Sequence, residues 1–305
     1  MNIHLSLLAL QSLRKIVTRL GVEVNVPSFF DLYGSSPAEF EGALRRVSSI
    51  LQDLMKEYGI TWWDIYLESD IGAERILLVN ELGISKGDRV LDVGCGRGYF
   101  SFAAARVAGL VIGIDLMDAF GRIGWWGQFL EVVRLLGLGG RVWGMAADAT
   151  KMPFRDSRFD VAAAVHSIRN FGSVEAVKTA VKEMKRVVKP GGYVILVENI
   201  PVAKNELQRN HLRLHSLRVR FIKSELRYLS EEELVGIVNE NEFKDVEVKV
   251  VDYGLCSTPA IFYIGKEQAK GNVDPALISE FKEVTQAIRR VGEISPPILM
   301  IKARK

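Results

Sequence analysis

Three closely spaced glycines after an apolar stretch are the residues most informative about chemistry in this chain. Residues 90–93 predict a buried strand, residues 101–107 predict a helix, and the glycines lie between them at positions 94, 96 and 98. Glycine lets a ligand approach the main chain closely, because it has no side chain and tolerates left-handed backbone conformations. A strand, a glycine turn and a helix in this order are typical of a nucleotide-binding loop, although the same turn also occurs without a ligand.

Two carboxylates follow at the ends of the next predicted strands. The apolar run 111–114 ends at Asp115, and the strand-like run 141–147 ends at Asp148. In open α/β sheets a carboxylate at the end of the second strand accepts hydrogen bonds from ribose hydroxyls. A carboxylate after the third strand can accept one from the exocyclic amine of adenine. The spacing therefore indicates a cofactor that contains a nucleoside.

Further elements alternate in the order expected of an α/β sheet. A strand is predicted over 158–165, a helix ends at a Lys-Pro-Gly-Gly turn over 189–192, and a strand over 193–197 ends at Glu198. Alternating strands and helices predict a parallel sheet covered by helices, with ligands bound at the carboxyl ends of the strands.

With these motifs in place, residues of about 75–265 resemble the class I S-adenosylmethionine-dependent methyltransferases. The resemblance implies a Rossmann-like, doubly wound α/β fold with a seven-stranded sheet of order 3-2-1-4-5-7-6. Its last strand is expected to be antiparallel and to come from residues 243–253 or 258–265. The implied cofactor is S-adenosyl-L-methionine, and no metal site is expected.

The resemblance also implies roles for single residues. The glycines would line the methionine end of the cofactor, Asp92 would fix the loop, Asp115 would bind the ribose and Asp148 would face the adenine. Cys95 lies inside the glycine turn, where a small side chain is needed. The complete set of implied cofactor-binding residues is Asp92, Gly94, Cys95, Gly96, Gly98, Asp115, Leu116, Asp148, Ala149 and His166.

Two segments are similar to a narrower group, the ubiquinone and menaquinone C-methyltransferases of methyltransferase type 11. Residues 186–192 read Arg-Val-Val-Lys-Pro-Gly-Gly and precede Glu198, and residues 168–170 resemble the Leu-Arg-Asn that follows the fourth strand in that group. The signature of the group ends Glu-x-Ser where this chain has Glu-Asn-Ile, and its upstream Tyr-Asp-x-Met-Asn has no counterpart at 63–66. These departures leave the acceptor open.

Polar residues after the fourth and fifth strands are the candidates for catalysis. The methyl group of the implied cofactor is already electrophilic, so a strong base is optional. His166 could take a proton from an acceptor hydroxyl or orient it, although a histidine at a strand end can also be structural. We predict His166, Arg169 and Glu198 as catalytic residues and Asn170 as a substrate contact.

The N-terminal extension, residues 1–72, is predicted to be helical. Apolar residues recur at helical spacing from Leu5 to Leu20 and again after Ser36, a plausible helix N-cap. Trp63 and Tyr66 belong to an aromatic cluster upstream of the sheet domain, where the resemblance places one wall of the substrate pocket. We predict that both contact substrate, with core packing as the alternative.

The predicted methyltransferase domain, residues 73–305, contains an insertion over about 200–228 and ends in a helix–strand extension over about 271–305. Cationic residues in the insertion recur every three or four positions, which predicts a basic helical face on a lid. The face comprises Arg209, Arg213, Ser216, Arg220, Lys223 and Arg227. Such a lid suits an anionic substrate, an anionic membrane surface or RNA, and Arg213 is predicted to contact substrate. An ordinary solvated face and a strand over 212–221 are the alternatives.

A second departure from a regular α/β pattern follows Asp115. Residues 117–127 contain several glycines and the pair Trp125-Trp126, and predict a loop near the adenosine, because glycine disfavours helix by about 1 kcal/mol per residue. One of the two indoles could stack on adenine, but packing as a hydrophobic wedge is the favoured role.

Composition places the chain among globular enzymes. It has 305 residues, of which 48% are hydrophobic and 25% charged, and its net charge is +3, so any attraction to nucleic acid or membrane must be local. Two cysteines cannot build a disulfide framework, which indicates a reducing compartment. No apolar run is long enough for a transmembrane segment, and we predict a cytoplasmic protein. The sequence does not predict an oligomeric state.

Three functions are consistent with these features. The first is methylation of a small-molecule or lipid-like acceptor at oxygen or carbon, since the hydrophobic extension and the basic lid suit an amphiphile. The second is methylation of a macromolecule, tRNA or protein, that docks on the basic lid. The third is a non-catalytic protein that binds S-adenosylmethionine.

Overall fold

The computed structural model describes residues 3–116, 125–221, 228–258 and 274–305, and the chain divides into two compact units. The sheet unit comprises Arg75–Pro201, Tyr228–Asp252 and Pro297–Lys305. The helical unit comprises Met1–Glu74, Val202–Arg227 and Tyr253–Pro296. The predicted lid and the C-terminal helix thus group with the N-terminal helices rather than with the sheet.

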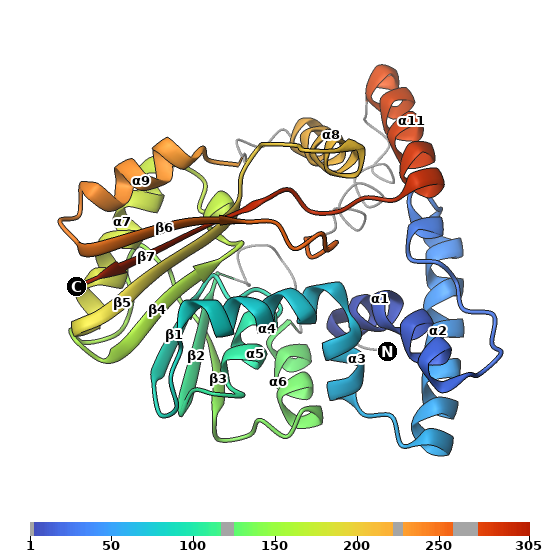
Figure 1. Ribbon diagram of the computed structural model, residues 1–305, viewed down its shortest axis with the longest axis horizontal. Coiled ribbons are helices and arrows are strands. Elements are labelled where there is room, and N and C mark those ends of the chain that lie inside the picture. The colour runs from blue at the N-terminus through green and yellow to red at the C-terminus, as the bar shows by residue number, and fades with distance from the viewer. Residues whose placement is uncertain (1–2, 117–124, 222–227, 259–273) are drawn as a thin grey trace. The chain divides into compact units, whose positions relative to one another are not determined.

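The sheet unit is built on seven strands in the order β3-β2-β1-β4-β5-β7-β6 (Figure 1). The strands are β1 (Arg89–Val93), β2 (Leu110–Asp115), β3 (Val142–Ala146), β4 (Phe159–Val165), β5 (Val188–Asn199), β6 (Lys244–Val251) and β7 (Ile298–Arg304). Strands β1 to β5 pair in parallel, and β7 runs antiparallel to both β5 and β6. The predicted fold and strand order are therefore confirmed.

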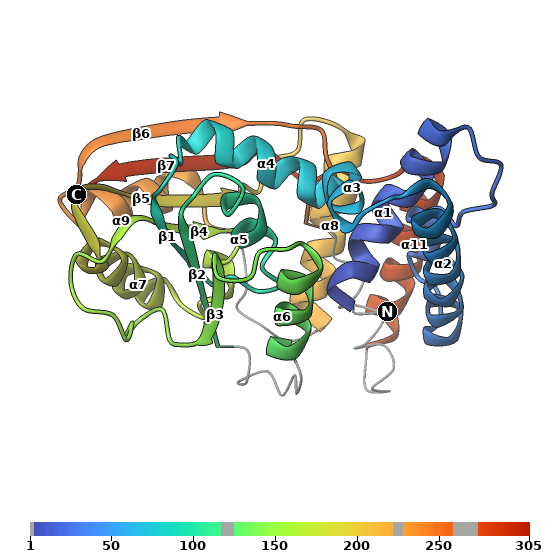
Figure 2. The ribbon, with the colours of Figure 1, turned by 90° about the horizontal axis from the view of Figure 1, so that it is seen from below.

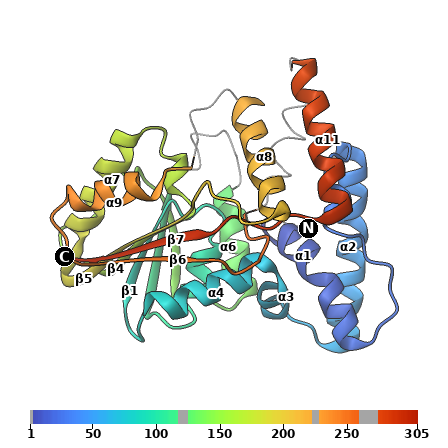
Figure 3. The same ribbon diagram turned by 45° about the horizontal axis from the view of Figure 1, so that its top comes forward.

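Helices cover the two faces of this sheet. They are α4 (Asp70–Leu82), α5 (Tyr99–Ala104), α6 (Trp125–Leu135), α7 (Val174–Val187) and α9 (Glu231–Asn239). Figure 3 shows α7 and α9 on one side of the strands and α4 on the other. The central strand β4 is buried along 161–165, which explains its run of small and β-branched residues.

The residues predicted for the antiparallel strand were wrong. Residues 244–251 form β6, which pairs only with β7 among the strands described, and residues 259–265 of the other candidate lie outside the described part. The antiparallel strand is β7, near the C-terminus. Its residues 298–301 are all buried, because β7 lies between two neighbours, and the preceding Pro296 and Pro297 mark where it begins.

Two local predictions also need correction. The Lys-Pro-Gly-Gly segment is no separate turn but an irregular start of β5, where the pairing with β4 shifts register and Gly191 has a φ of +79°. In the predicted loop 117–127, residues 125–127 belong to α6, and 117–124 lie outside the described residues. Trp126 packs edge-on against Phe129 and under Gly144 of β3, in agreement with a hydrophobic wedge.

The helical unit contains the predicted N-terminal helices. Its elements are α1 (Ile3–Leu20), the short η1 (Phe30–Leu32), α2 (Pro37–Tyr58), α3 (Trp62–Glu68), α8 (Glu206–Phe221) and α11 (Pro275–Val291). Helix α1 packs against α2 and α3, as Figure 2 shows. Ser36 is the N-cap of α2, and it forms a capping box with Glu39, as the sequence predicts for this position. No helix among the described residues is long and apolar enough to cross a membrane.

A buried carboxylate joins four segments of the helical unit. Glu293 accepts hydrogen bonds from the Tyr33 hydroxyl and from Cys256 Sγ, at 3.4 Å in the second case, and its Oε2 lies 3.5 Å from His211 Nδ1. All four side chains are buried. Burial and the nearby Glu293 raise the pKa of Tyr33 and of Cys256 well above their usual values, so both donors keep their protons. The carboxylate therefore has three partners from distant parts of the sequence.

Replacing this carboxylate should destabilise the helical unit. We expect Glu293→Gln to lower the free energy of unfolding by about 3 kcal/mol, because the buried network then loses the negative charge and one of its two acceptor oxygens. Urea denaturation monitored by circular dichroism measures the effect, with the exposed Glu23→Gln as the control for loss of one negative charge. Equal stability of the two variants would contradict a central role for Glu293.

Candidate functional site

The glycine loop connects β1 to α5 and is held against the end of β2. The backbone N–H groups of Gly94 and Cys95 both donate to the carbonyl of Ile114, at 2.8 and 2.9 Å. Gly98 has a φ of +81°, and a Cβ there would lie 2.4 Å from the ring of Phe129, so only glycine fits. Gly96 also has a positive φ, but a Cβ would meet no described atom within 4 Å. The backbone at Gly96 therefore borders open space that a ligand can fill.

Two carboxylates fix the shape of this loop. Asp115, at the end of β2, accepts a hydrogen bond of 2.7 Å from the Gly96 N–H. Asp92 is buried beneath the loop and accepts a hydrogen bond of 2.6 Å from the Ser101 hydroxyl on α5. Burial raises the pKa of Asp92 to about 7. The structure thus places Asp92 where a loop-fixing residue is expected.

The residues predicted to meet the nucleoside lie at the same edge of the sheet. Asp115 pairs in register with Ala146, the last residue of β3, so Asp148 follows on the neighbouring strand. The Asp148 carboxylate accepts hydrogen bonds from the backbone N–H and the hydroxyl of Thr150, at 2.8 and 2.7 Å. Leu116 and Asp148 are exposed, and Ala149 is half-buried. Their contacts to a cofactor stay a prediction.

A buried carboxylate lies at the same edge of the sheet, where β4 and β5 end. Glu198, near the end of β5, is only 1% exposed, and its Oε1 contacts Arg169 Nη1. It also accepts from the backbone N–H of Asn199 at 3.0 Å, and its Oε1 lies 3.5 Å from His166 Nδ1. Burial favours the protonated acid, but Arg169 and His166 outweigh it, and the pKa of Glu198 is lowered. Glu198 is therefore ionised at neutral pH.

His166 follows β4 in a left-handed conformation, with a φ of +52°. Its backbone N–H donates to the carbonyl of Val197 at 2.8 Å, and its ring is buried. Burial, with a contribution from the positive charge of Arg75, lowers the pKa of His166 to about 4. The imidazole is thus neutral near pH 7. The Glu198 carboxylate favours the tautomer with its proton on Nδ1, so Nε2 carries the lone pair that can accept a proton.

The loop after β4 links the histidine to the glycine loop. The Ser167 hydroxyl donates to the carbonyl of Val93 at 2.7 Å, and a Cβ at Gly94 would lie 2.6 Å from Ser167 Cβ. The two loops are therefore in direct contact. The structure brings the predicted catalytic residues His166, Arg169 and Glu198 together beside the end of the loop assigned to the methionine part of the cofactor.

Asn170 follows this cluster in the chain, whereas Trp63, Tyr66 and Arg213 belong to the helical unit. Asn170 ends the short helix η3 (Ile168–Asn170) and is exposed. Trp63 and Tyr66 lie on α3 of the helical unit with ring centroids 5.6 Å apart, and Tyr66 is completely buried, as expected of a core residue. Arg213 lies on α8, and its guanidinium is 2.8 Å from Glu283 on α11. Substrate contacts of these four residues stay a prediction.

Sequence reasoning missed three residues that support the site: Ser101, Arg75 and Tyr228. Arg75 is buried on α4 and acts electrostatically on both Asp92 and His166. The ring of Tyr228 lies 5.3 Å from the guanidinium of Arg169. A signal for Arg75 is present, because it shares the helical spacing of the buried Ile71, Leu78 and Leu82 and so places a charge on an apolar face. Tyr228 is distant in sequence and carries no such signal.

Comparison with known proteins agrees with this geometry. Residues 91–196 match the sequence profile of the methyltransferase domain family. The chain is 27% identical over 255 residues to demethylmenaquinone methyltransferase from Staphylococcus aureus, an alignment that covers 74% of this chain and 96% of that protein. It is 32% identical over 134 residues to a sterol 4-C-methyltransferase from Caenorhabditis elegans, covering 44% of this chain but only 38% of the relative.

The fold is shared with a cyclopropane-fatty-acyl-phospholipid synthase-like protein from Lactobacillus casei. The two structures align with a TM-score of 0.60 and 20% identity, covering 77% of this chain and 91% of the other. Fold and sequence profile together define a class I S-adenosylmethionine-dependent methyltransferase. The chain belongs to this class, with a methyltransferase domain of type 11 and distant homology to the demethylmenaquinone enzymes.

The residues present fit S-adenosylmethionine. The open space at Gly96 admits a ligand against the backbone, and Asp115 and Asp148 follow neighbouring strands at the same edge. A carboxylate offers several lone pairs, so Asp115 can accept from ribose hydroxyls while it holds the Gly96 N–H. Glycine backbone and Asp115 would hold the methionine and ribose parts, with Asp148 at the adenine.

Substitutions at the predicted cofactor site should weaken cofactor binding. We expect Gly96→Val and Asp115→Ala each to weaken S-adenosylmethionine binding at least about tenfold, because one fills the open space and the other removes the ribose acceptor. Isothermal titration calorimetry measures the affinity. Gly137→Val is the matched control, because Gly137 also has a positive φ with no atom near its Cβ position but lies at the end of α6. Wild-type affinity in both loop variants would refute the site.

The buried histidine should make the fold sensitive to acid. Its pKa is lowered in the folded state, so the unfolded chain takes up the proton first as the pH falls below about 6.5, and stability is lost down to about pH 4. The loss amounts to about 3 kcal/mol at most. We expect His166→Asn, which tolerates the left-handed backbone, to lose less stability than wild type over this range in urea denaturation. If the free energies of unfolding of wild type and His166→Asn changed equally with pH, a lowered pKa of His166 would be excluded.

Proposed function

We propose that the protein methylates a small, lipid-like acceptor at a hydroxyl oxygen or at an activated carbon next to one. The observation that carries this proposal is the buried, neutral His166 held by Glu198 beside the glycine loop. A neutral imidazole has a free lone pair that can take the proton of an acceptor hydroxyl as the methyl group is transferred. Burial makes this imidazole a weak base, and the neighbouring Glu198 carboxylate opposes that effect by favouring the protonated ring. An acceptor that is already a free nucleophile would not need a base to remove a proton.

In the proposed reaction, three side chains have separate roles beside the cofactor. S-adenosylmethionine supplies, when bound, a methyl group on a positively charged sulfur that needs no further activation. His166 Nε2 accepts the acceptor proton, and Glu198 stabilises the resulting imidazolium, whose Nδ1 lies 3.5 Å away. Arg169 keeps Glu198 ionised at its buried position and is itself held against Tyr228. Carbon methylation uses the same step, because loss of the hydroxyl proton makes the neighbouring carbon of an enol or phenol nucleophilic.

The named relatives support a lipid-like acceptor. One is named as a demethylmenaquinone methyltransferase and the other as a sterol 4-C-methyltransferase, so the acceptors that the two names give are demethylmenaquinone and a sterol. Residues 165–168 read Val-His-Ser-Ile and lack the Asp/Asn-Pro-Pro-aromatic motif of enzymes that methylate amino groups of nucleobases. Both observations favour a small molecule over RNA.

Docking of a macromolecule on the basic lid is less well supported. The helix predicted for the lid is formed as α8, and Arg209, Arg213 and Arg220 are exposed on it. Arg213 and Arg220, however, pair with Glu283 and Glu280 of α11, at 2.8 and 2.6 Å. Lys223 and Arg227 lie outside the described residues. Two of the three described cations are thus neutralised within the helical unit.

Transfer of a labelled methyl group identifies the class of acceptor. Purified protein, radiolabelled S-adenosylmethionine and fractionated cell extract should give label in the organic-soluble lipid fraction. Label in RNA or protein, with none in lipids, would overturn the proposal.

Variants test the catalytic assignment with that acceptor. We expect His166→Asn to lower kcat about a hundredfold, as is typical for loss of a general base. The rate that remains should also lose the dependence on pH that a titrating base imposes. The exposed Asn239→Ala, at the end of α9, serves as the control, since it removes an amide side chain that is not among the predicted site residues. Full activity of His166→Asn would exclude the histidine as base.

A further inference from the structure

The strand β6 forms one edge of the seven-stranded sheet. Figure 2 shows it as the outermost strand, and β7 is its only neighbour among the described strands. The backbone of an edge strand presents N–H and C=O groups with which a further strand can pair. The side chains at 247–250 are all exposed, and they include Val248 and Val250, each 42% exposed. An edge strand with exposed valines is suited to the addition of another strand.

The side chains of β6 alternate between the two faces of the sheet. Lys249 contacts Glu81 of α4 and therefore lies on the α4 face, which position 247 shares. Val248 pairs in register with the buried Ile301 of β7 and lies on the opposite face, as does Val250. Charged and apolar side chains in this part of β6 are thus separated onto two faces.

The order of residues in β6 is self-complementary. Val248 is flanked by Glu247 and Lys249, which have opposite charges, and then by Val246 and Val250. When two copies pair antiparallel about a twofold axis, residues at equal distances on either side of the axis lie opposite each other on the same face. An axis at Val248 therefore places Glu247 of each copy opposite Lys249 of the other. The same axis places Val246 of each copy opposite Val250 of the other.

The neighbouring registers bring like charges together. An axis at Glu247 would place the two Glu247 carboxylates opposite each other, and an axis at Lys249 would do the same with two ammonium groups. An axis at Val246 would place Asp245 opposite Glu247. Charges on an edge strand usually prevent pairing. Among these four registers, the one about Val248 is the only one in which they favour it.

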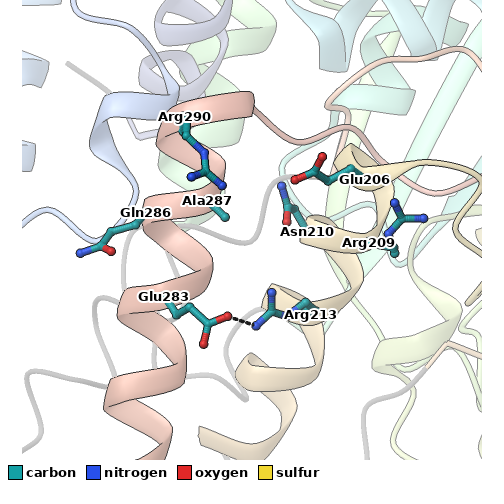
Figure 4. Close-up of a pocket in the computed structure, with 8 residues that line it drawn as sticks. All are labelled: Glu206, Arg209, Asn210, Arg213, Glu283, Gln286, Ala287 and Arg290. Carbon is teal, nitrogen blue, oxygen red and sulfur yellow. Dashed lines mark hydrogen bonds and ion pairs between the residues drawn. The ribbon is translucent and has the colours of Figure 1, made fainter.

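The charged groove between α8 and α11 is less suited to self-association. Among the described residues that line it, Ala287 is the only apolar one. Figure 4 shows Arg213 paired with Glu283 across this groove, at 2.8 Å, so part of its charge is already compensated within one chain. The edge of β6, in contrast, combines exposed valines with a self-complementary order of charges.

We propose that two copies of the chain associate through β6, antiparallel about Val248, so that their sheets continue into one. Backbone hydrogen bonds join the two edges, the two Glu247–Lys249 pairs select the register, and the valines of both strands lose exposed apolar surface. Lys249 is 60% exposed beside Glu81 and is therefore accessible to a carboxylate of the second copy. The paired segment is short, because β6 shifts register against β7 between residues 244 and 247 and ends at 251. This association is independent of the proposed methyl transfer.

Light scattering over a range of protein concentrations tests the association. We expect a mass that rises towards twice the 34.1 kDa of one chain. Glu247→Lys and Lys249→Glu should each raise the dissociation constant at least about tenfold, because like charges then lie opposite each other twice in the dimer. The exposed Glu23→Lys is the control for charge reversal and should associate as wild type does. A monomeric wild type, or association unaffected by both reversals at β6, would overturn the proposal.

A mixture of the two variants tests the charge pairs directly. Positions 247 and 249 are both positive in Glu247→Lys and both negative in Lys249→Glu, so a mixed dimer brings opposite charges together at both positions. We expect an equimolar mixture to form heterodimers at concentrations at which neither variant associates alone. A mixture that stays monomeric would refute the pairing of Glu247 with Lys249.

Cysteine cross-linking tests the register. In Val248→Cys the two thiols lie opposite each other at the axis, with Cα atoms about 4.5–5.5 Å apart, which is within the range of a disulfide. In Val250→Cys they lie four residues apart along the strands, at about 14 Å. We expect mild oxidation to cross-link Val248→Cys and not Val250→Cys, since Cys95 and Cys256 are buried. Equal cross-linking of the two variants would refute an axis at Val248.

Discussion

The ionised carboxylate of Glu198, buried near the end of β5, is the constraint on which the candidate active site depends. A buried charge is costly unless cations and hydrogen-bond donors surround it. Arg169, His166 and the Asn199 N–H meet this requirement, and each lies on a segment that must then stay in place. The left-handed backbone of His166 costs roughly 1–2 kcal/mol, which the contacts of its ring and backbone offset. The imidazole of His166 is thus held in one orientation, because it pairs with the buried charge of Glu198.

The loop after β4, which contains His166, also connects the cluster around Glu198 to the glycine loop. Ser167 follows His166 directly, contacts the glycine loop at Gly94 and donates to the carbonyl of Val93 at the end of β1. Ends of β1, β2, β4 and β5 therefore converge, as the carboxyl ends of parallel strands do in open α/β sheets. His166 and the glycine loop are thus positioned by one edge of the sheet.

Local features were predictable from sequence, and long-range pairings were not. The glycine loop and Asp115 follow from motifs that lie within short stretches of chain, and the family resemblance that these motifs carry implies the strand order. The position of the antiparallel strand does not, because β7 comes last in the chain yet inserts between β5 and β6. Tyr228 comes from a segment that carries no signal, and the helical spacing that marks Arg75 as buried does not say which groups it acts on, so the effects of these two residues on Arg169 and His166 depend on folding.

The basic stripe of α8 shows how a charge pattern can mislead when its partners are distant in sequence. Read alone, arginines at helical spacing indicate a docking surface, but α11 supplies Glu283 and Glu280 opposite Arg213 and Arg220 from positions 70 and 60 residues away. Pairs on an exposed surface add little stability, so they act chiefly to reduce the net charge that the helix presents.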